Sequence, residues 1–154
     1  MNKKTISIIL LIIFLITAML TLANVFLGDA NTQENQTGTL TIDNRTVHYE
    51  KSGKCLEVID GNTIQVYGVG RVQLIQVRAP DSEPGISQAR NFVVDKCLGK
   101  TVYLDIDDKN PKDRYDRTLA IVYTDDTDIN KELIKNKLAD ISYFSPSEFK
   151  RGEV

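Results

Sequence analysis

The predicted elements follow an order that is typical of a mainly β, α+β domain: a five-stranded barrel of the OB type with two or three helices. Three observations lead to this fold class. Three short strand-like segments are joined by glycine-containing turns, a segment with helical periodicity follows them, and two further strands precede a second helical segment. The barrel domain is expected over residues 39–154.

The strands are predicted from alternating apolar and polar residues that are interrupted by turn residues. A short hairpin is expected around Asp43-Asn44, between residues 40–43 and 46–49. Three strands then form a meander through Asp60-Gly61-Asn62 and Gly68-Val69-Gly70. These three cover residues 55–59, 63–69 and 71–77, and two later strands cover residues 101–106 and 117–123.

Two helices are predicted from apolar residues that recur every three or four positions. The first is expected over residues 86–98, with a stripe made of Ile86, Ala89, Val93 and Cys97. Asp128 is expected to cap the second, whose stripe consists of Ile129, Leu133, Ile134 and Leu138. Residues 139–144 are expected to be extended, and the tail from Ser145 to be coil.

One core is expected inside the barrel, closed by the first helix. The residues predicted to lie in or near it are Val58, Ile64, Val66, Leu74, Val77, Leu104, Leu119 and Ile121.

The first 28 residues predict a membrane anchor. Residues 5–27 carry no charge, and as a helix they would span roughly 34 Å, enough to cross a bilayer core. Lys3 and Lys4 precede them, which favours a cytoplasmic N-terminus and an extracytoplasmic domain. A cleaved signal segment, giving a secreted protein, is the alternative. Residues 29–38 are polar and are expected to form a tether.

Charge and cysteine content narrow the possible functions. The formal net charge of −2 argues against a protein that coats DNA, because strong non-specific binding normally needs a basic surface. His48 is the single histidine, so a histidine metal centre is not expected. Cys55 and Cys97 are interpreted as a disulfide or as two buried small side chains, and the exported setting favours the disulfide.

Three motifs together carry a resemblance to a known family. They are residues 58–64 (Val-Ile-Asp-Gly-Asn-Thr-Ile), residues 77–81 (Val-Arg-Ala-Pro-Asp) and residues 113–120 (Asp-Arg-Tyr-Asp-Arg-Thr-Leu-Ala). With the Asn-x-x-Leu pattern of the second helix, they occur in the order and spacing of the thermonuclease family, whose type member is staphylococcal nuclease. Residues 53–144 resemble this family.

The resemblance implies hydrolysis of phosphodiester bonds in DNA or RNA with calcium as the cofactor. In the family, carboxylates on the first turn and the segment before the proline hold calcium, and a glutamate after that proline activates water. Two arginines hold the phosphate and stabilise the charge of the transition state. Asp60 and Asn62 match metal positions, Asp81 matches the catalytic acid, and Arg117 matches the second arginine.

Several residues depart from the family pattern. Asn62 is a neutral amide where the family has a carboxylate, and Arg78 is a cation where it has a second acid. Ala79 replaces a threonine, and Gln73 replaces the first arginine. We therefore expect Arg78 to oppose calcium, to point between Asp60 and Asp81, and to leave hydrolysis weak or lost.

Other positions predict contacts with a nucleic acid or a nucleotide phosphate. Arg114, Tyr115 and Tyr143 match family residues that contact the phosphate or lie near the base. Arg71, two residues before Gln73 and on the same strand face, could replace the missing arginine from about 6.8 Å away.

Three functional interpretations stay open at this point. The chain could be a nuclease with a remodelled site in which Asp81 is the base. It could be a non-catalytic module of the cell envelope that binds nucleic acid, phosphate or a protein partner. It could also be a structural domain anchored in the membrane.

Overall fold

The computed structural model of the protein describes Ile12 and residues 37–154. The chain divides after Gln33, and the fold belongs to the second unit, Glu34–Val154. The membrane anchor expected over residues 5–27 lies, apart from Ile12, outside the described residues. Within the described part, no helix has both the length and the apolar character needed to cross a membrane.

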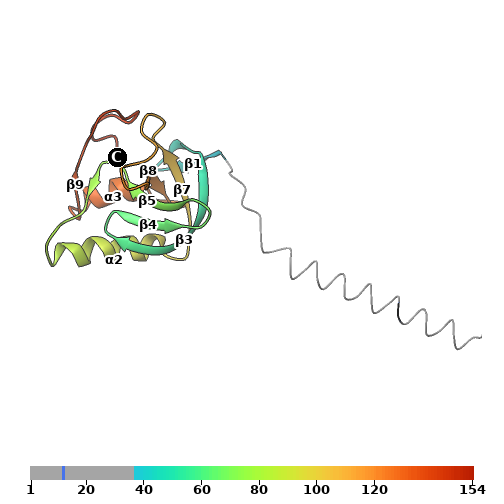
Figure 1. Ribbon diagram of the computed structural model, residues 1–154, viewed down its shortest axis with the longest axis horizontal. Helices are drawn as coiled ribbons and strands as arrows, with labels where there is room; N and C mark the ends of the chain where they lie inside the picture. Colours follow the sequence, from blue (N-terminus) through green and yellow to red (C-terminus); the bar gives the residue numbers. More distant parts are fainter. Residues whose placement is uncertain (1–11, 13–36) are drawn as a thin grey trace, which may run out of the picture. The chain divides into compact units, whose positions relative to one another are not determined.

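Five strands form a closed barrel (Figure 1). They are β3 (Lys51–Asp60), β4 (Thr63–Val66), β5 (Gly70–Leu74), β7 (Thr101–Ile106) and β8 (Thr118–Tyr123). Their order around the barrel is β3-β4-β5-β8-β7, and β3 closes it by pairing with both β4 and β7. Only the β5–β8 pair is parallel. The predicted mainly β fold with a five-stranded OB-type barrel is therefore confirmed.

The turn between β3 and β4 is tight because a hydrogen bond within the turn and close packing against α2 both restrict it. The Asn62 backbone N–H donates to Asp60 Oδ1 at 2.8 Å, which fixes the reversal of the chain. Gly61 is buried under the first helix, and a Cβ at this position would lie 2.7 Å from the Ala89 Cβ. Only glycine lets the turn approach the helix so closely.

Two helices are described, α2 (Gly85–Cys97) and α3 (Ile129–Lys135). α2 buries Ala89, Val93 and Cys97, the predicted stripe without Ile86, which is 37% exposed. Asp128 caps α3 as predicted, because its side chain accepts a hydrogen bond from the Lys131 N–H at 2.9 Å. α3 ends before Leu138.

The apolar residues form two cores rather than the single core that was predicted. The barrel interior, α2 and α3 share the first, which includes six of the expected residues: Val58, Ile64, Val66, Leu74, Val77 and Leu104. Leu119 and Ile121 belong instead to a second core with Ile42, Phe149 and Val154. The reason is that β8 is buried on both faces, so alternate side chains point into different cores.

Four short strands lie outside the barrel. β1 (Gly38–Ile42) and β2 (Arg45–Tyr49) form the predicted hairpin, whose register pairs Ile42 with Arg45. β6 (Val77–Arg78) pairs with β9 (Asp140–Ile141), which is all of the expected extended segment 139–144 that forms a strand.

Residues 145–154, here called the C-terminal strap, have no helix or strand but are held firmly. Phe149 and Val154 are buried in the second core. The buried Gln76 side chain donates to the Lys150 carbonyl and accepts from the Gly152 N–H, both at 2.9 Å. The tail expected to be coil is thus an integral part of the packing.

Carboxylates crowd the place where the strap meets β7. The pKa of Asp105 is raised to about 7, mainly by burial and in addition by four nearby carboxylates: Glu50, Glu148, Asp108 and Glu153. The Glu148 backbone N–H donates to Asp107 Oδ1 at 3.0 Å. Asp107 is fully buried, and its Oδ2 has no hydrogen-bond partner in the described part of the chain. Negative charge therefore accumulates at this junction.

The two cysteines correct another expectation. Cys55 and Cys97 are buried in the same core, but both are free thiols, so the favoured disulfide is not formed. The Cys55 Sγ instead donates to the Glu57 carbonyl at 3.6 Å. Burial raises the pKa of Cys97 to about 12, which keeps this thiol protonated and unreactive.

Candidate functional site

Arg117 is the centre of the candidate site. It ends the loop 107–117 just before β8, and two side chains fix its guanidinium group. Nε donates to Asp113 Oδ2 at 2.8 Å, Nη2 lies 2.7 Å from the same oxygen, and Nη1 donates to Thr63 Oγ1 at 3.3 Å. Both members of the Arg117–Asp113 pair are shielded, with side chains 22% and 15% exposed.

Asp113 is a carboxylate held in its charged form. Burial alone would raise its pKa, but the guanidinium of Arg117 and the backbone N–H groups of Arg117 and Tyr115 outweigh burial and hold the pKa below its ordinary value. The Asp113 Oδ1 accepts from those two N–H groups at 3.0 and 2.8 Å. One side chain therefore shapes the loop and orients the arginine.

The Tyr115 ring lies beside two guanidinium groups. Arg114 Cζ is 4.8 Å and Arg117 Cζ is 5.4 Å from the ring centroid, which places both cations within cation–π distance. Tyr115 itself is 61% exposed. The result is an exposed aromatic surface whose orientation is supported by two positive charges.

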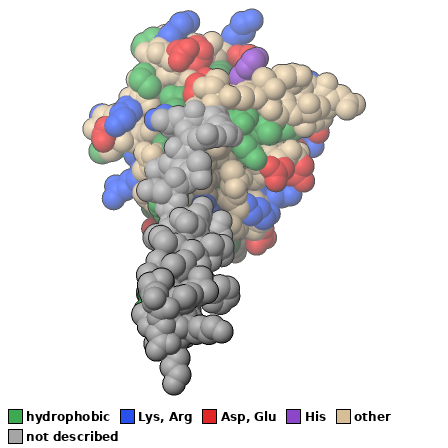
Figure 2. All heavy atoms as spheres, turned by 90° about the vertical axis from the view of Figure 1, so that its right-hand side faces the viewer, with side chains coloured by type: hydrophobic (Ala, Val, Ile, Leu, Met, Phe, Trp, Pro, Cys, Tyr) green, Lys and Arg blue, Asp and Glu red, His purple; other side chains and the backbone are tan. Residues whose placement is uncertain are grey.

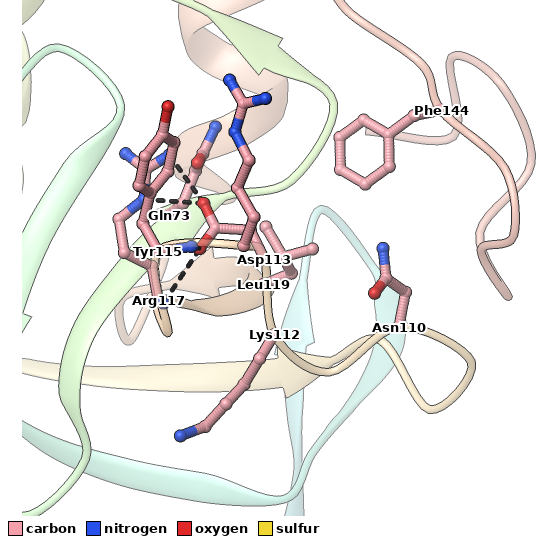
Figure 3. Close-up of a pocket in the computed structure, with 9 residues that line it drawn as sticks. Gln73, Asn110, Lys112, Asp113, Tyr115, Arg117, Leu119 and Phe144 are labelled. Atoms are coloured by element: carbon pink, nitrogen blue, oxygen red, sulfur yellow. Dashed lines mark hydrogen bonds and ion pairs between the residues drawn. The ribbon is translucent and has the colours of Figure 1, made fainter.

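A pocket of about 540 Å³, here called the Tyr115 pocket, opens next to this ring. Its lining comes from β5, β8, the loop 107–117 and the segment after β9: Gln73, Asn110, Lys112, Asp113, Arg114, Tyr115, Arg117, Leu119 and Phe144. In Figure 3, Phe144 and Asn110 lie across the pocket from Tyr115 and Arg117. The pocket thus combines apolar walls with positive charge.

A second pocket of about 370 Å³, here called the Arg71 pocket, is also lined by Arg117. Its lining is Glu57, Ile59, Asp60, Thr63, Gln65, Arg71 and Arg117. Arg71 and Arg117 therefore share a pocket with Asp60, and Arg117 lines both pockets. Two guanidinium groups beside one hollow can hold a phosphate group.

The first turn is joined to β6 by the Asn62 side chain. Asn62 Nδ2 donates to the Val77 carbonyl at 2.7 Å, and Asn62 Oδ1 accepts from the Thr63 hydroxyl at 3.3 Å. Thr63 Oγ1 is also the atom that accepts from Arg117. A continuous hydrogen-bonded path therefore runs from Arg117 to the backbone of β6.

Arg78 does not lie where the sequence predicted. Its guanidinium donates to Asp140 Oδ2 at 3.2 Å, and both side chains are largely exposed, at 69% and 77%. The expectation that Arg78 points between Asp60 and Asp81 was therefore wrong. The reason is strand pairing, because Arg78 lies directly opposite Asp140 in the β6–β9 register.

The remaining predicted residues lie at the edge of the site. Asp81 is exposed and lines neither of the two pockets described above. Tyr143 is 38% exposed, and the neighbouring Phe144 lines the Tyr115 pocket in its place. Sequence reasoning missed Asp113, Thr63 and Phe144. Of these three, only Asp113 could have been inferred from the sequence, because it is an acidic residue in the same charged loop as Arg117.

The residues around the first turn do not fit the calcium ion that the family resemblance implies. Calcium needs several hard oxygen ligands, usually with carboxylates among them. Here Asn62 turns its amide nitrogen to Val77, and its oxygen already accepts from Thr63. Across the residues that the structure describes, no group of three or more His, Cys, Asp or Glu side chains is placed to hold a metal ion.

Comparisons with known proteins agree with the barrel fold. The profile of the family described as staphylococcal nuclease homologue matches residues 71–153. The thermonuclease of Staphylococcus intermedius is 36% identical over 101 residues, which is 59% of this chain and 60% of that protein. The thermonuclease of Staphylococcus hyicus is 33% identical over 108 residues, 64% of this chain and 63% of that protein.

A third relative is an uncharacterized endonuclease of Haemophilus influenzae, 31% identical over 91 residues, which is 56% of this chain and 49% of that protein. The chain spans less than two thirds of the length of each of these three relatives.

Proposed function

Because the chain belongs to the staphylococcal nuclease family, we propose that its barrel domain binds the phosphodiester backbone of DNA or RNA. We further propose that hydrolysis by this domain is reduced or lost. Arg117 and Arg71 hold a phosphate in the Arg71 pocket, and the Tyr115 pocket receives the neighbouring nucleotide.

The observation that carries the binding proposal is the way in which Arg117 is held. A guanidinium group has five N–H donors. Nε and Nη1 each donate one hydrogen bond, and Nη2 lies against Asp113. This leaves one N–H on each terminal nitrogen without a partner in the described part of the chain. Such a fork suits two oxygens of one phosphate.

The Tyr115 pocket supports contact with a nucleotide next to that phosphate. Tyr115 and Phe144 offer aromatic surfaces on which a base can stack, and stacking accepts any base. Arg114 adds a positive charge beside the ring. We therefore propose that single-stranded nucleic acid is preferred and that its sequence matters little.

Reduced hydrolysis is proposed from the groups that should activate water. Asp81 lies outside both described pockets, and Gln73 and Asn62 are neutral amides where the family has charged groups. Arg117 and Arg71 with their supporting residues can bind a phosphate diester. They do not supply the base that hydrolysis of such a bond requires.

The overall surface predicts modest affinity. Lys and Arg side chains alternate with Asp and Glu side chains on the face drawn in Figure 2, and the formal net charge is −2. Binding therefore depends on a few local contacts, which we expect to weaken as salt increases.

We also propose, from residues 5–27 and the preceding lysines, that the domain is anchored in the membrane and faces the extracytoplasmic side. Secretion after cleavage of this segment is the alternative. Fusing a reporter enzyme that is active only outside the cytoplasm to residue 154 tests the orientation. A reporter that stays inactive would contradict it.

The binding proposal is tested with the full-length protein in mild detergent. Fluorescence anisotropy with a labelled single-stranded oligonucleotide measures affinity in EDTA for the wild type and for Arg117→Gln. We expect the variant to bind about tenfold more weakly, because it loses charge-assisted hydrogen bonds. Arg90→Gln is the matched control, because Arg90 is an exposed residue of α2 that lines neither pocket. This variant removes the same charge and should change affinity less than about twofold.

Equal affinity of the wild type and Arg117→Gln would refute the binding proposal, as would no binding by the wild type. Cleavage of the same oligonucleotide, followed on denaturing gels with and without calcium, tests the second part. Rapid cleavage that requires calcium would contradict reduced hydrolysis.

A further inference from the structure

The amide of Asn62 links two segments that are distant in the sequence. Asn62 belongs to the turn between β3 and β4, and Val77 begins β6, fifteen positions later. The Nδ2···O distance of 2.7 Å makes this a short hydrogen bond, and the Val77 side is buried. The link fixes the first turn against the segment that leads to Pro80 and Asp81.

An amide can make this link, and an ionised carboxylate cannot make it without help. A carbonyl oxygen accepts hydrogen bonds and never donates them, so its partner must carry an N–H or O–H. An ionised aspartate in place of Asn62 would put a negatively charged oxygen against the Val77 carbonyl oxygen. That arrangement is repulsive unless a cation or a proton lies between the two oxygens.

The same amide reaches Arg117 through Thr63. Thr63 is 2% exposed, and its hydroxyl has one proton to donate. The proton goes to Asn62 Oδ1, and an oxygen lone pair accepts from Arg117 Nη1. Donor and acceptor directions are therefore consistent along the whole path, from Arg117 through Thr63 and Asn62 to Val77.

We propose that Asn62 and Thr63 are positioning residues that hold Arg117 ready for phosphate without a metal ion. In this arrangement the amide of Asn62 connects the first turn to β6, a connection that a carboxyl group could make only with a bound cation or an added proton. The inference rests on the proposed phosphate-binding function and extends it: substrate binding by this chain is independent of divalent metals.

Thr63 provides the sharpest test because its hydroxyl can be removed without changing size or charge. Oligonucleotide affinity is measured by anisotropy on the full-length protein in EDTA, at a temperature at which circular dichroism shows every variant folded. We expect Thr63→Val to weaken binding about fivefold and Thr63→Ser to bind within about twofold of the wild type. Equal affinity of Thr63→Val and wild type would overturn the proposal. Equal loss in Thr63→Ser and Thr63→Val would also overturn it, because packing rather than the hydroxyl would then be responsible.

Asn62 is tested by two changes. Asn62→Leu removes both hydrogen bonds without adding charge, and we expect the same loss of affinity as for Thr63→Val. Asn62→Asp should lower the melting temperature in EDTA, and calcium should restore part of this loss. Asn91→Asp, at an exposed position of α2, adds the same charge away from the first turn. Its melting temperature should equal that of the wild type in EDTA and should not change when calcium is added. A wild type whose affinity rises severalfold in calcium would refute metal independence.

A readout that needs no ligand separates this inference from the proposed function. One of the two Arg117 Nη1 protons donates to Thr63 Oγ1. The Nη1 protons give a distinct NMR signal only while this hydrogen bond restricts rotation about the Cζ–Nη1 bond. We expect this signal in the wild type and in Thr63→Ser, and its loss by fast exchange in Thr63→Val and Asn62→Leu. If the wild type binds no oligonucleotide but the signal follows this pattern, the proposed function fails and the positioning role stands. A signal unaffected by either substitution would overturn the positioning role.

Discussion

Replacing Asp105 by asparagine should stabilise the protein in alkaline solution and have little effect in acid. Asp105 lies on β7 where the C-terminal strap packs, and its pKa is raised from an ordinary 3.8 to about 7, mainly by burial. The neighbouring carboxylates act in the same direction. A carboxylate whose folded pKa is raised binds its proton more tightly in the folded state than in the unfolded state.

The sign of the effect follows from this difference. Below about pH 4 Asp105 is protonated in both states, so folding is not penalised. As pH rises from about 4 to 7, the unfolded state loses the proton first and the folded state becomes relatively less stable. Above about pH 7 the whole penalty is present. An asparagine has no proton to lose and escapes it.

The magnitude follows from the two pKa values. A difference of roughly three pKa units corresponds to about 4 kcal/mol. Asp105 is only partly buried, so solvent screens part of this energy, and we expect a gain of about 2 kcal/mol at pH 8. For a domain of this size, such a gain raises the melting temperature by about 6 °C or more.

Thermal unfolding followed by circular dichroism at pH 4 and pH 8 tests the prediction. Asp95→Asn, at an exposed position of α2, is the matched control and should change the melting temperature by a similar small amount at both pH values. An equal gain for Asp105→Asn at both pH values, or no gain at pH 8, would show that the buried charge is not the cause.

Two further predictions concern buried amides. Asn130→Ala should lower the free energy of unfolding by about 3 kcal/mol in urea titrations, because the fully buried amide accepts from the Val122 N–H and donates to the Ile75 carbonyl; an unchanged urea midpoint would count against it. Gln76→Leu should speed hydrogen exchange at Gly152 at least tenfold, because the strap loses both amide contacts, one of them to this N–H. Exchange at the wild-type rate would mean that the apolar side chains alone hold the strap.

The barrel and its helices could be predicted because their signals are local. Alternation marked the strands, and Ala89, Val93 and Cys97 marked the buried face of α2 by their spacing alone. Asp128 marked the start of α3, because a cap needs only its own side chain and the next turn. The order of these elements then allowed few topologies.

The errors concern contacts that local patterns do not encode. Leu119 was predicted to share a core with Leu104, but β8 is covered on its outer face by the strap, whose sequence reads as polar coil. Arg78 was predicted to approach Asp60, but its direction depends on pairing with a two-residue strand that carries Asp140. Strands so short give almost no signal in the sequence.

The sequence singled out individual residues of the candidate site but not the hydrogen bonds that join them. The resemblance located Arg117 and Asn62, yet only the folded chain reveals that Thr63 joins them. Side-chain hydrogen bonds between distant strands depend on rotamers that tertiary packing selects. For the same reason Phe144, which has no polar group, gave no sign of lining a pocket.

The C-terminal strap has a consequence for biosynthesis. Gln76 meets its two partners 74 and 76 positions later in the chain. A growing polypeptide therefore cannot complete the second core until the last of these residues has left the ribosome. Until then the second core, which contains Leu119 and Ile121 of β8, lacks Phe149 and Val154 and is covered only by its other members, among them Ile42. The nascent protein should consequently be a client of chaperones that recognise exposed apolar strands, and the final closure should be the slow step of its maturation.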